Sequence, residues 1–171
     1  MTSVLDKFYR FLMLLACISM VSAFLTIMLG VAAREFGWDI QGLDAYAGYS
    51  IAATLFLALP GTLKQGDHIR VTLVLQRLSP RAQNVLEYWC LAAASLLSSY
   101  VAWFACRLVW VSYVTHDMSP SADASPLWIP QLAMALGCIG FAVAFWHALW
   151  ARWAGQDFFV VPAEGELAKT E

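Results

Sequence analysis

The sequence predicts an all-α integral membrane protein with four transmembrane helices, an amphipathic helix at the cytoplasmic interface between the second and third, and both termini in the cytoplasm. Composition is the first observation behind this prediction. Of the 171 residues, 61% are hydrophobic and 13% are charged, with a mean hydropathy of +0.65, whereas soluble domains are about half apolar and a quarter charged. The formal net charge of -2 excludes the strong basic field of a nucleic-acid-binding protein.

The lengths of the apolar stretches are the second observation. A helix needs about 20 apolar residues to cross a bilayer, and four stretches meet this requirement. They are residues 11–33, 45–63, 85–114 and 127–150. A membrane β-barrel would show alternating segments of about ten residues instead. The first stretch exceeds the apolar core of a signal peptide, so we expect it to be retained. We place the four spans in one membrane domain, residues 1–155, followed by a polar tail, residues 156–171, that we expect to be disordered.

The distribution of Lys and Arg is the third observation, and it predicts the orientation. Cytoplasmic segments carry an excess of these residues. Eight of the ten fall in the two terminal segments and in the loop between the second and third spans. These eight are Lys7, Arg10, Lys64, Arg70, Arg77, Arg81, Arg152 and Lys169. Because Arg34 and Arg107 alone lie toward the opposite side, both termini should be cytoplasmic.

The segment "GDHIRVTLVLQRLSPR", residues 66–81, is too charged for a bilayer core and too apolar for a solvated loop. A helical wheel separates it into an apolar and a polar face. The apolar face holds Val71, Val74, Leu75 and Leu78, and the polar face holds Arg70, Thr72, Gln76 and Arg77. An alternating strand fits residues 69–75 about as well, but an isolated strand beside a bilayer leaves its backbone edges unpaired. We therefore expect an interfacial amphipathic helix over residues 68–79, ended by Pro80.

Ionisable residues are scarce inside the spans. An autonomous transporter needs such a group at membrane depth, facing the interior of the bundle, yet no span has an acidic residue near its middle. Glu87 lies near the cytoplasmic end of the third span, where we expect an interfacial carboxylate or the partner of an arginine in the preceding loop. Arg107 shares a face with Trp103 and Trp110, so we expect a snorkelling cation over an aromatic belt.

Cysteine and histidine residues show no pattern of a redox or metal site. Thiol oxidation requires paired cysteines near the membrane surface, and haem requires histidines at matched depths. The cysteines are single and mostly deep, and the histidines lie in loops or at a span end. The residues concerned are Cys17, Cys90, Cys106, Cys138, His68, His116 and His147. We expect small packing cysteines and no catalytic residue, cofactor or metal.

Small residues recur at helical spacing within the spans. The third span carries a candidate helix-packing ladder, Ala94, Ser98, Ala102 and Cys106. The second and fourth spans carry shorter ones, at Gly48 and Ala52, at Ala133 and Gly137, and at Gly140, Ala144 and Ala148. Such ladders let membrane helices approach closely, although alanine-rich helices also produce them by chance. The eight tryptophans, mostly near span ends, fit interfacial anchors.

Two motifs carry a family resemblance. After the second span the chain reads "GDHIRVTLVLQRLSP", and it enters the fourth span with "SPLWIPQLAMALG". Residues 5–153 resemble the small, DctQ-like permease subunit of tripartite ATP-independent periplasmic (TRAP) transporters. The matching positions are Gly66, His68, Ile69, Arg70, Val71, Pro126, Trp128 and Pro130. Thr72 stands where the family often has Asp, and Asp44 stands where it commonly has Glu.

The resemblance implies a non-catalytic scaffold in the bacterial inner membrane. In such transporters a periplasmic binding protein delivers an organic anion, and a large permease subunit carries it together with sodium. The small subunit braces the large one, and specificity for the anion resides in the other two components. The implied interface with the large subunit or with membrane lipids comprises His68, Ile69, Arg70, Val71, Leu75, Arg77 and Leu78. The alternative from another class is a quinone- or haem-linked membrane anchor of a redox complex.

Overall fold

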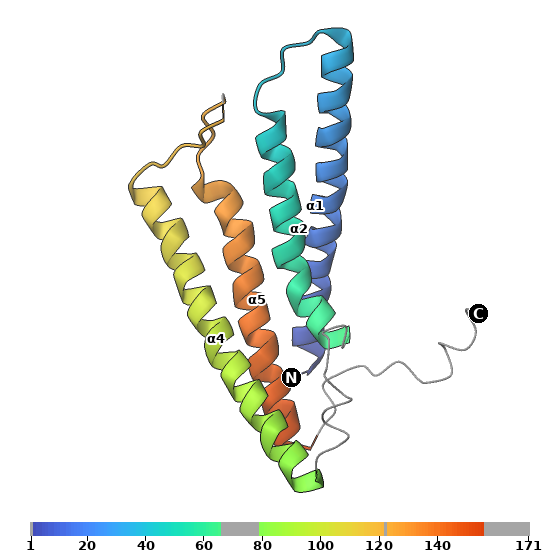
Figure 1. The fold of residues 1–171 in the computed structure, drawn as a ribbon, viewed down its shortest axis with the longest axis vertical. Helices are drawn as coiled ribbons and strands as arrows, with labels where there is room; N and C mark the ends of the chain where they lie inside the picture. Colours follow the sequence, from blue (N-terminus) through green and yellow to red (C-terminus); the bar gives the residue numbers. More distant parts are fainter. Residues whose placement is uncertain (1, 66–78, 122, 156–171) are drawn as a thin grey trace, which may run out of the picture.

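The computed structural model describes residues 2–65, 79–121 and 123–155. Within these ranges the chain forms four helices and no strand (Figure 1). The helices are α1 (Thr2–Phe36), α2 (Leu43–Gln65), α4 (Pro80–Val114) and α5 (Trp128–Trp153). All four are long and apolar enough to cross a membrane, so the predicted all-helical class and the four spans are confirmed. The interfacial helix predicted over residues 68–79 lies outside the described residues, apart from Ser79.

Helix α1 begins nine residues before the apolar stretch that predicted it and ends three residues after it, and α4 begins five residues before its own stretch. Each has 35 residues, which is about 52 Å at 1.5 Å per residue, whereas a hydrocarbon core is about 30 Å thick. Helix α1 starts at Thr2 because residues 2–10 contain no Gly or Pro that would stop it. Helix α4 starts at Pro80 because Ser79 caps it: the Ser79 hydroxyl accepts a hydrogen bond from the Ala82 N–H at 3.5 Å, and proline is favoured in the first turn.

The four helices form an open layer rather than a closed bundle. Helix α1 packs on α2, α2 packs on α5, and α5 packs on α4, with a minor contact between α1 and α5. Helices α1 and α4 therefore lie at opposite edges of the layer (Figure 1). One end of the layer holds the start of α1, the end of α2, the start of α4 and the end of α5. We call it the inner end, because the predicted orientation places it on the cytoplasmic side. The α1–α2 and α4–α5 loops share the opposite, outer end.

Small residues on α5 hold the middle of the layer together. Two of its faces are buried, one toward α4 and the other toward α1 and α2. The buried residues are Ala135, Gly137, Cys138, Gly140, Ala142, Ala144, Ala148 and Ala151. Ala135, Cys138 and Ala142 pack against Ala102 and Ala105 of α4. On the other side, Ala144 and Ala148 belong to a cluster with Tyr9 of α1 and Leu63 of α2.

Helices α5 and α2 approach each other closely at two glycines of α5. At Gly137, an added Cβ would lie 2.5 Å from the carbonyl carbon of Phe56 and 2.8 Å from its Cβ, where 3.4 Å or more is ordinary contact. Because a backbone group cannot turn aside as a side chain can, only glycine fits this position without moving a helix. At Gly140, an added Cβ would lie 2.9 Å from Cγ of Pro60.

Candidate interaction surfaces

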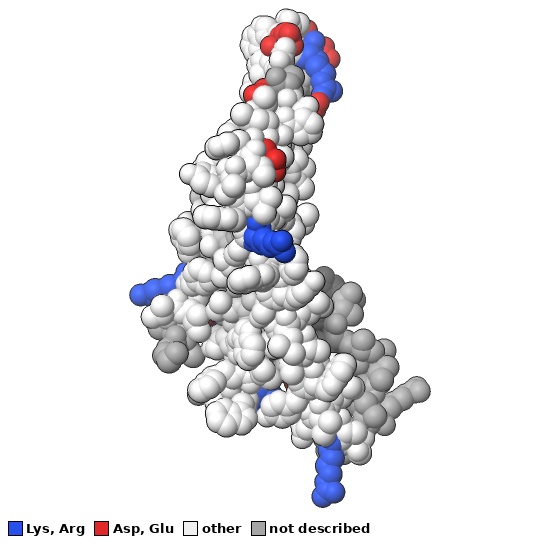
Figure 2. Space-filling view, turned by 90° about the vertical axis from the view of Figure 1, so that its left-hand side faces the viewer, with Lys and Arg blue, Asp and Glu red and all other residues white. Residues whose placement is uncertain are grey.

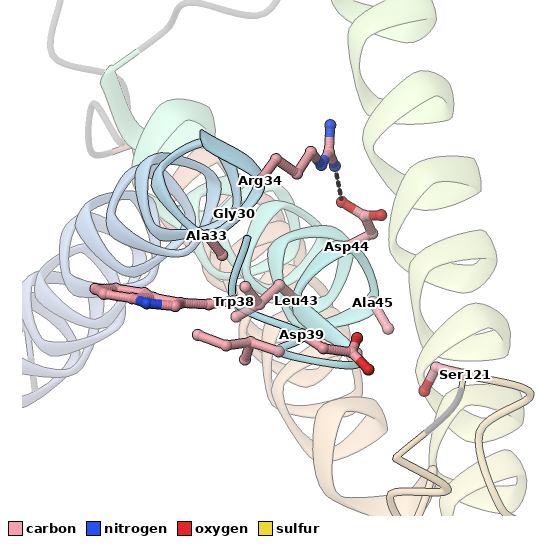
Figure 3. A pocket seen from close by; sticks show the side chains of 11 residues that line it. Gly30, Ala33, Arg34, Trp38, Asp39, Leu43, Asp44, Ala45 and Ser121 are labelled. Atoms are coloured by element: carbon pink, nitrogen blue, oxygen red, sulfur yellow. Dashed lines mark hydrogen bonds and ion pairs between the residues drawn. The ribbon is translucent and has the colours of Figure 1, made fainter. Parts of the chain in front are cut away.

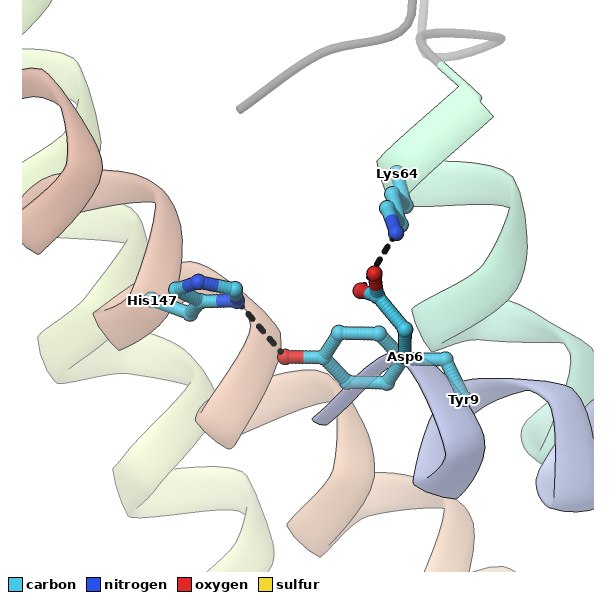
Figure 4. A network of polar contacts seen from close by, with 4 residues as sticks. All are labelled: Asp6, Tyr9, Lys64 and His147. Atoms are coloured by element: carbon cyan, nitrogen blue, oxygen red, sulfur yellow. Dashed lines mark hydrogen bonds and ion pairs between the residues drawn. The ribbon is translucent and has the colours of Figure 1, made fainter. Parts of the chain in front are cut away.

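Polar contacts at the inner end connect α1 to both of its neighbours. The ammonium of Lys64 on α2 lies 2.5 Å from a carboxylate oxygen of Asp6. One turn further along α1, the hydroxyl of Tyr9 lies 3.3 Å from Nδ1 of His147 on α5. Figure 4 shows the two contacts leaving the same region of α1 in different directions. Both couple helices that are far apart in the sequence.

Arg152 makes the corresponding connection between α5 and α4. Its guanidinium lies 2.8 Å from Glu87 and donates a hydrogen bond of 2.8 Å to the amide oxygen of Asn84. It also lies 5.9 Å from the ring centre of Tyr88, whose hydroxyl donates to the Arg152 carbonyl at 3.2 Å. Among the described residues, Glu87 is thus paired with an arginine of α5, while Arg70 and Arg77 of the loop before α4 lie outside the described residues.

The α4–α5 loop is attached to α2 at the outer end. The Tyr49 hydroxyl lies 2.6 Å from the buried hydroxyl of Ser119, which lies 2.8 Å from that of Ser121. Ser121 in turn donates a hydrogen bond to the carboxylate of Asp123, and this bond holds the pKa of Asp123 below its usual value. The loop therefore has a defined shape over α2 rather than a freely solvated path.

A pocket of about 350 Å³ opens beside this loop, between the outer ends of α1 and α2. Its charged lining consists of Arg34, Asp39 and Asp44, and Ser121 closes one side (Figure 3). Arg34 and Asp44 pair with each other at 3.2 Å. Because the pocket holds two carboxylates and one guanidinium that is already paired, its electrostatics do not favour an organic anion.

The residues singled out from the sequence fall into two groups. His68, Ile69, Arg70, Val71, Leu75, Arg77 and Leu78 lie outside the described residues. On α4, Ser98 and Ala102 are buried, Ala94 is partly buried and Cys106 is exposed. Sequence reasoning missed Ser95, Ala105 and Ser112, which are buried on the same helix. Alternating steps of three and four residues, rather than a strict step of four, would have found them.

The cysteines and histidines are dispersed over the described part of the chain. Among the cysteines, Cys138 is buried, whereas Cys17, Cys90 and Cys106 are exposed on helix surfaces. Packing within this chain therefore accounts for Cys138, whereas the packing role expected for Cys17, Cys90 and Cys106 stays a prediction. Within the described ranges, no group of three His, Cys, Asp or Glu residues could hold a metal ion.

The two edge helices expose different kinds of side chain. Between Phe11 and Val31, the large exposed side chains of α1 are Phe, Leu, Ile, Met and Val. Between Trp89 and Val114, those of α4 also include Trp and Tyr, and Arg107 is exposed among them. Figure 2 looks at the side of the molecule on which α4 lies and shows a largely uncharged surface, with acidic side chains toward its upper end and basic ones spaced along its length. Both edges suit a membrane, but only that of α4 is rich in hydrogen-bond donors.

A family model described as "Tripartite ATP-independent periplasmic transporters, DctQ component" matches residues 23–155. This match covers most of the chain, including the outer half of α1 and all of α2, α4 and α5. The chain belongs to the DctQ family. It is therefore the small permease component of a TRAP transporter. With four helices that can cross a membrane, it is a multi-pass membrane protein. The family implies two partners, a large permease and a substrate-binding protein. No match to this DctQ component was found among curated proteins or solved structures.

Proposed function

We propose that this DctQ component is a non-catalytic scaffold that braces the large permease subunit of a sodium-coupled TRAP transporter. The transporter would lie in the bacterial inner membrane and import an organic anion, a carboxylate or similar compound, delivered by the periplasmic binding protein. The observation that carries the proposal is the open layer. A layer one helix thick encloses no path between its own helices, and the ion pairs found in the described residues lie at helix ends. Such a chain supplies surface to a partner more readily than a route for an ion.

Reconstitution tests this proposal. Proteoliposomes with the DctQ component alone should take up no organic anion, with or without a sodium gradient, because its spans have no acidic group near the middle to coordinate sodium. Adding the large permease and the loaded binding protein should produce uptake that requires sodium. Sodium-driven uptake by the DctQ component alone would refute the scaffold role. The redox-anchor alternative has no support from the family match.

The segment over residues 68–79 belongs to the same proposal as an interfacial helix between lipid and the large permease. Its apolar side chains would face acyl chains or the partner, and Arg70 and Arg77 would face phosphate or partner carboxylates. Leu75→Asp should weaken copurification of the large permease because a carboxylate on the apolar face costs about 1 kcal/mol or more. Thr72→Asp, on the polar face, is the matched control and should be tolerated. Equal loss with both variants, or with neither, would refute this arrangement.

A further inference from the structure

One exposed face of α4 carries four side chains that can donate hydrogen bonds. Tyr100, Trp103, Arg107 and Trp110 follow one another at steps of three or four residues, so they lie on the same side of the helix. Tyr100 is 62% exposed, Trp103 is 70% exposed, and Trp110 is 67% exposed. Arg107 is exposed as well. These four residues are called the α4 aromatic face below.

The depth of this face follows from the rise of the helix. Aromatic residues near the two ends of a span mark the membrane interfaces. On α4 these are Trp89 at the inner end and Tyr113 at the outer end, where the Tyr113 ring packs on Trp128 at 5.7 Å. The two positions are about 36 Å apart along the axis. Tyr100 lies near their midpoint, and Arg107 lies about 10 Å farther toward the outer end. Both are attached within a hydrocarbon core of about 30 Å.

The donors of this face have no acceptor within the described part of the chain. Tyr100, Trp103, Arg107 and Trp110 make no hydrogen bond or ion pair with another described residue. Trp146 of α5 provides a contrast, because its indole nitrogen donates to the Ser99 hydroxyl at 2.9 Å. Polar groups left unsatisfied in hydrocarbon are costly, and ionisable residues at membrane depth usually have a partner there. The acceptors for this face must come from outside the described chain.

Helix α1 shows what a lipid-facing edge of this chain looks like. Its large exposed side chains between Phe11 and Val31 are apolar and carry no donor. Of the three hydroxyl side chains on this stretch, two have hydrogen-bond partners: Thr26 donates to the Ser22 carbonyl at 2.7 Å, and the Ser22 hydroxyl lies 3.4 Å from that of Ser50. The chain therefore presents a plain apolar surface at one edge of the layer and a donor-rich aromatic surface at the other.

We propose that the α4 aromatic face is the surface on which the large permease subunit packs, with a carboxylate of that subunit facing Arg107. This inference rests on the proposed scaffold function and adds the surface through which the scaffold acts. A lipid phosphate could receive the Arg107 guanidinium by snorkelling, but near the midplane a lipid offers only acyl chains to the Tyr100 hydroxyl. A protein surface offers acceptors at both depths. Trp, Tyr and Arg are also the side chains that contribute most at protein interfaces.

Site-specific photo-crosslinking in the assembled transporter tests the proposal. A benzophenone amino acid replaces Trp103 in one sample and, as the control at the opposite edge, Phe24 of α1, which is 59% exposed. The Trp103 position should give an adduct with the large permease, whereas the Phe24 position should give none. An adduct of the Trp103 position with phospholipid alone, or an adduct with the large permease at Phe24 alone, would overturn the proposal. If the wild-type chain does not copurify with the large permease at all, the scaffold function itself fails.

Variants of Arg107 test the charge. Arg107→Leu should reduce copurification of the large permease at least tenfold, because it leaves the facing carboxylate unpaired at membrane depth. Arg107→Lys should keep most of the copurification, and Leu25→Ala on the exposed side of α1 should keep all of it. Thermal unfolding of the isolated chain should be the same for Arg107→Leu and wild type, which separates lost contact from misfolding. Full copurification of the Arg107→Leu variant would contradict the carboxylate partner.

Discussion

Gly137→Ala should separate the middle of the layer, because an added methyl group would overlap the backbone of Phe56. The added Cβ would lie 2.5 Å from the carbonyl carbon of Phe56 and 2.8 Å from its Cβ, where 3.4 Å is ordinary contact. Helices α5 and α2 must therefore move apart by about 1 Å. A gap of this size removes about a quarter to a half of the van der Waals attraction between the atoms that it separates. Overpacking of this kind typically costs about 1–3 kcal/mol. Replacing glycine by alanine in a helix returns about 0.5–1 kcal/mol, so the expected net destabilisation is about 1 kcal/mol, within limits of about 0 and 2.5 kcal/mol.

Gly48→Ala is the matched control for this variant. Gly48 also lies within a membrane helix, but an added Cβ there meets nothing within 4 Å. It should therefore show the propensity gain alone and be neutral or slightly stabilised. Thermal unfolding followed by tryptophan fluorescence in one detergent measures both variants. If Gly137→Ala is as stable as Gly48→Ala, the close approach of α5 to α2 is not required, and the reasoning is refuted.

Three further predictions concern the ends of the helices. Arg152→Ala should destabilise the isolated chain by about 1 kcal/mol, because the side chains of Arg152 and Glu87 are only 37% and 29% exposed. Arg34→Ala should have little effect, because the side chains of Arg34 and Asp44 are 73% and 92% exposed. Equal effects of the two variants in thermal unfolding would contradict this. Tyr49→Phe should remove about 1 kcal/mol from the attachment of the α4–α5 loop, and hydrogen exchange in residues 115–121 should rise about fivefold; unchanged exchange would show that the loop is held by other contacts. In a cysteine-free background, single cysteines at Ser3 or Ala82 should resist an impermeant thiol reagent in intact cells and one at Ser121 should react; labelling at Ala82 would invert the predicted orientation.

The local features of the fold were predictable from the sequence, because they depend on short stretches of chain. Apolar length predicted the four spans, although α4 begins at Pro80, five residues before the predicted start of the third span at residue 85, because Ser79 caps the helix there. The glycine at 137 was part of a small-residue pattern, and the structure shows that it permits a backbone contact with Phe56. In each case the residue and its immediate neighbours carry the information.

The partners across the layer were not predictable from the sequence, because they depend on which helices become neighbours. Glu87 was expected to be an interfacial carboxylate or the partner of an arginine of the preceding loop, and its partner among the described residues is Arg152 of the last helix. Nothing in the spacing of either residue specifies that pairing. The order of the helices in the layer could not be predicted from sequence periodicity either. An amphipathic or small-residue face shows that a helix has a neighbour, but not which helix that neighbour is.

The distribution of contacts explains how a single layer of helices can keep its shape. Burial of apolar surface drives little association between helices in lipid, so close packing and polar contacts must supply it. Close packing acts in the middle of the layer, where the small residues of α5 meet α2 and α4. Polar contacts act at the inner end, where Asp6, Tyr9 and Arg152 connect neighbouring helices. Helices α4 and α5 are joined in both ways, by small residues in the middle and by Arg152 at the inner end, so neither can rotate about a single joint. A layer held together in this way, with donors exposed along α4, suits the scaffold function proposed for this chain.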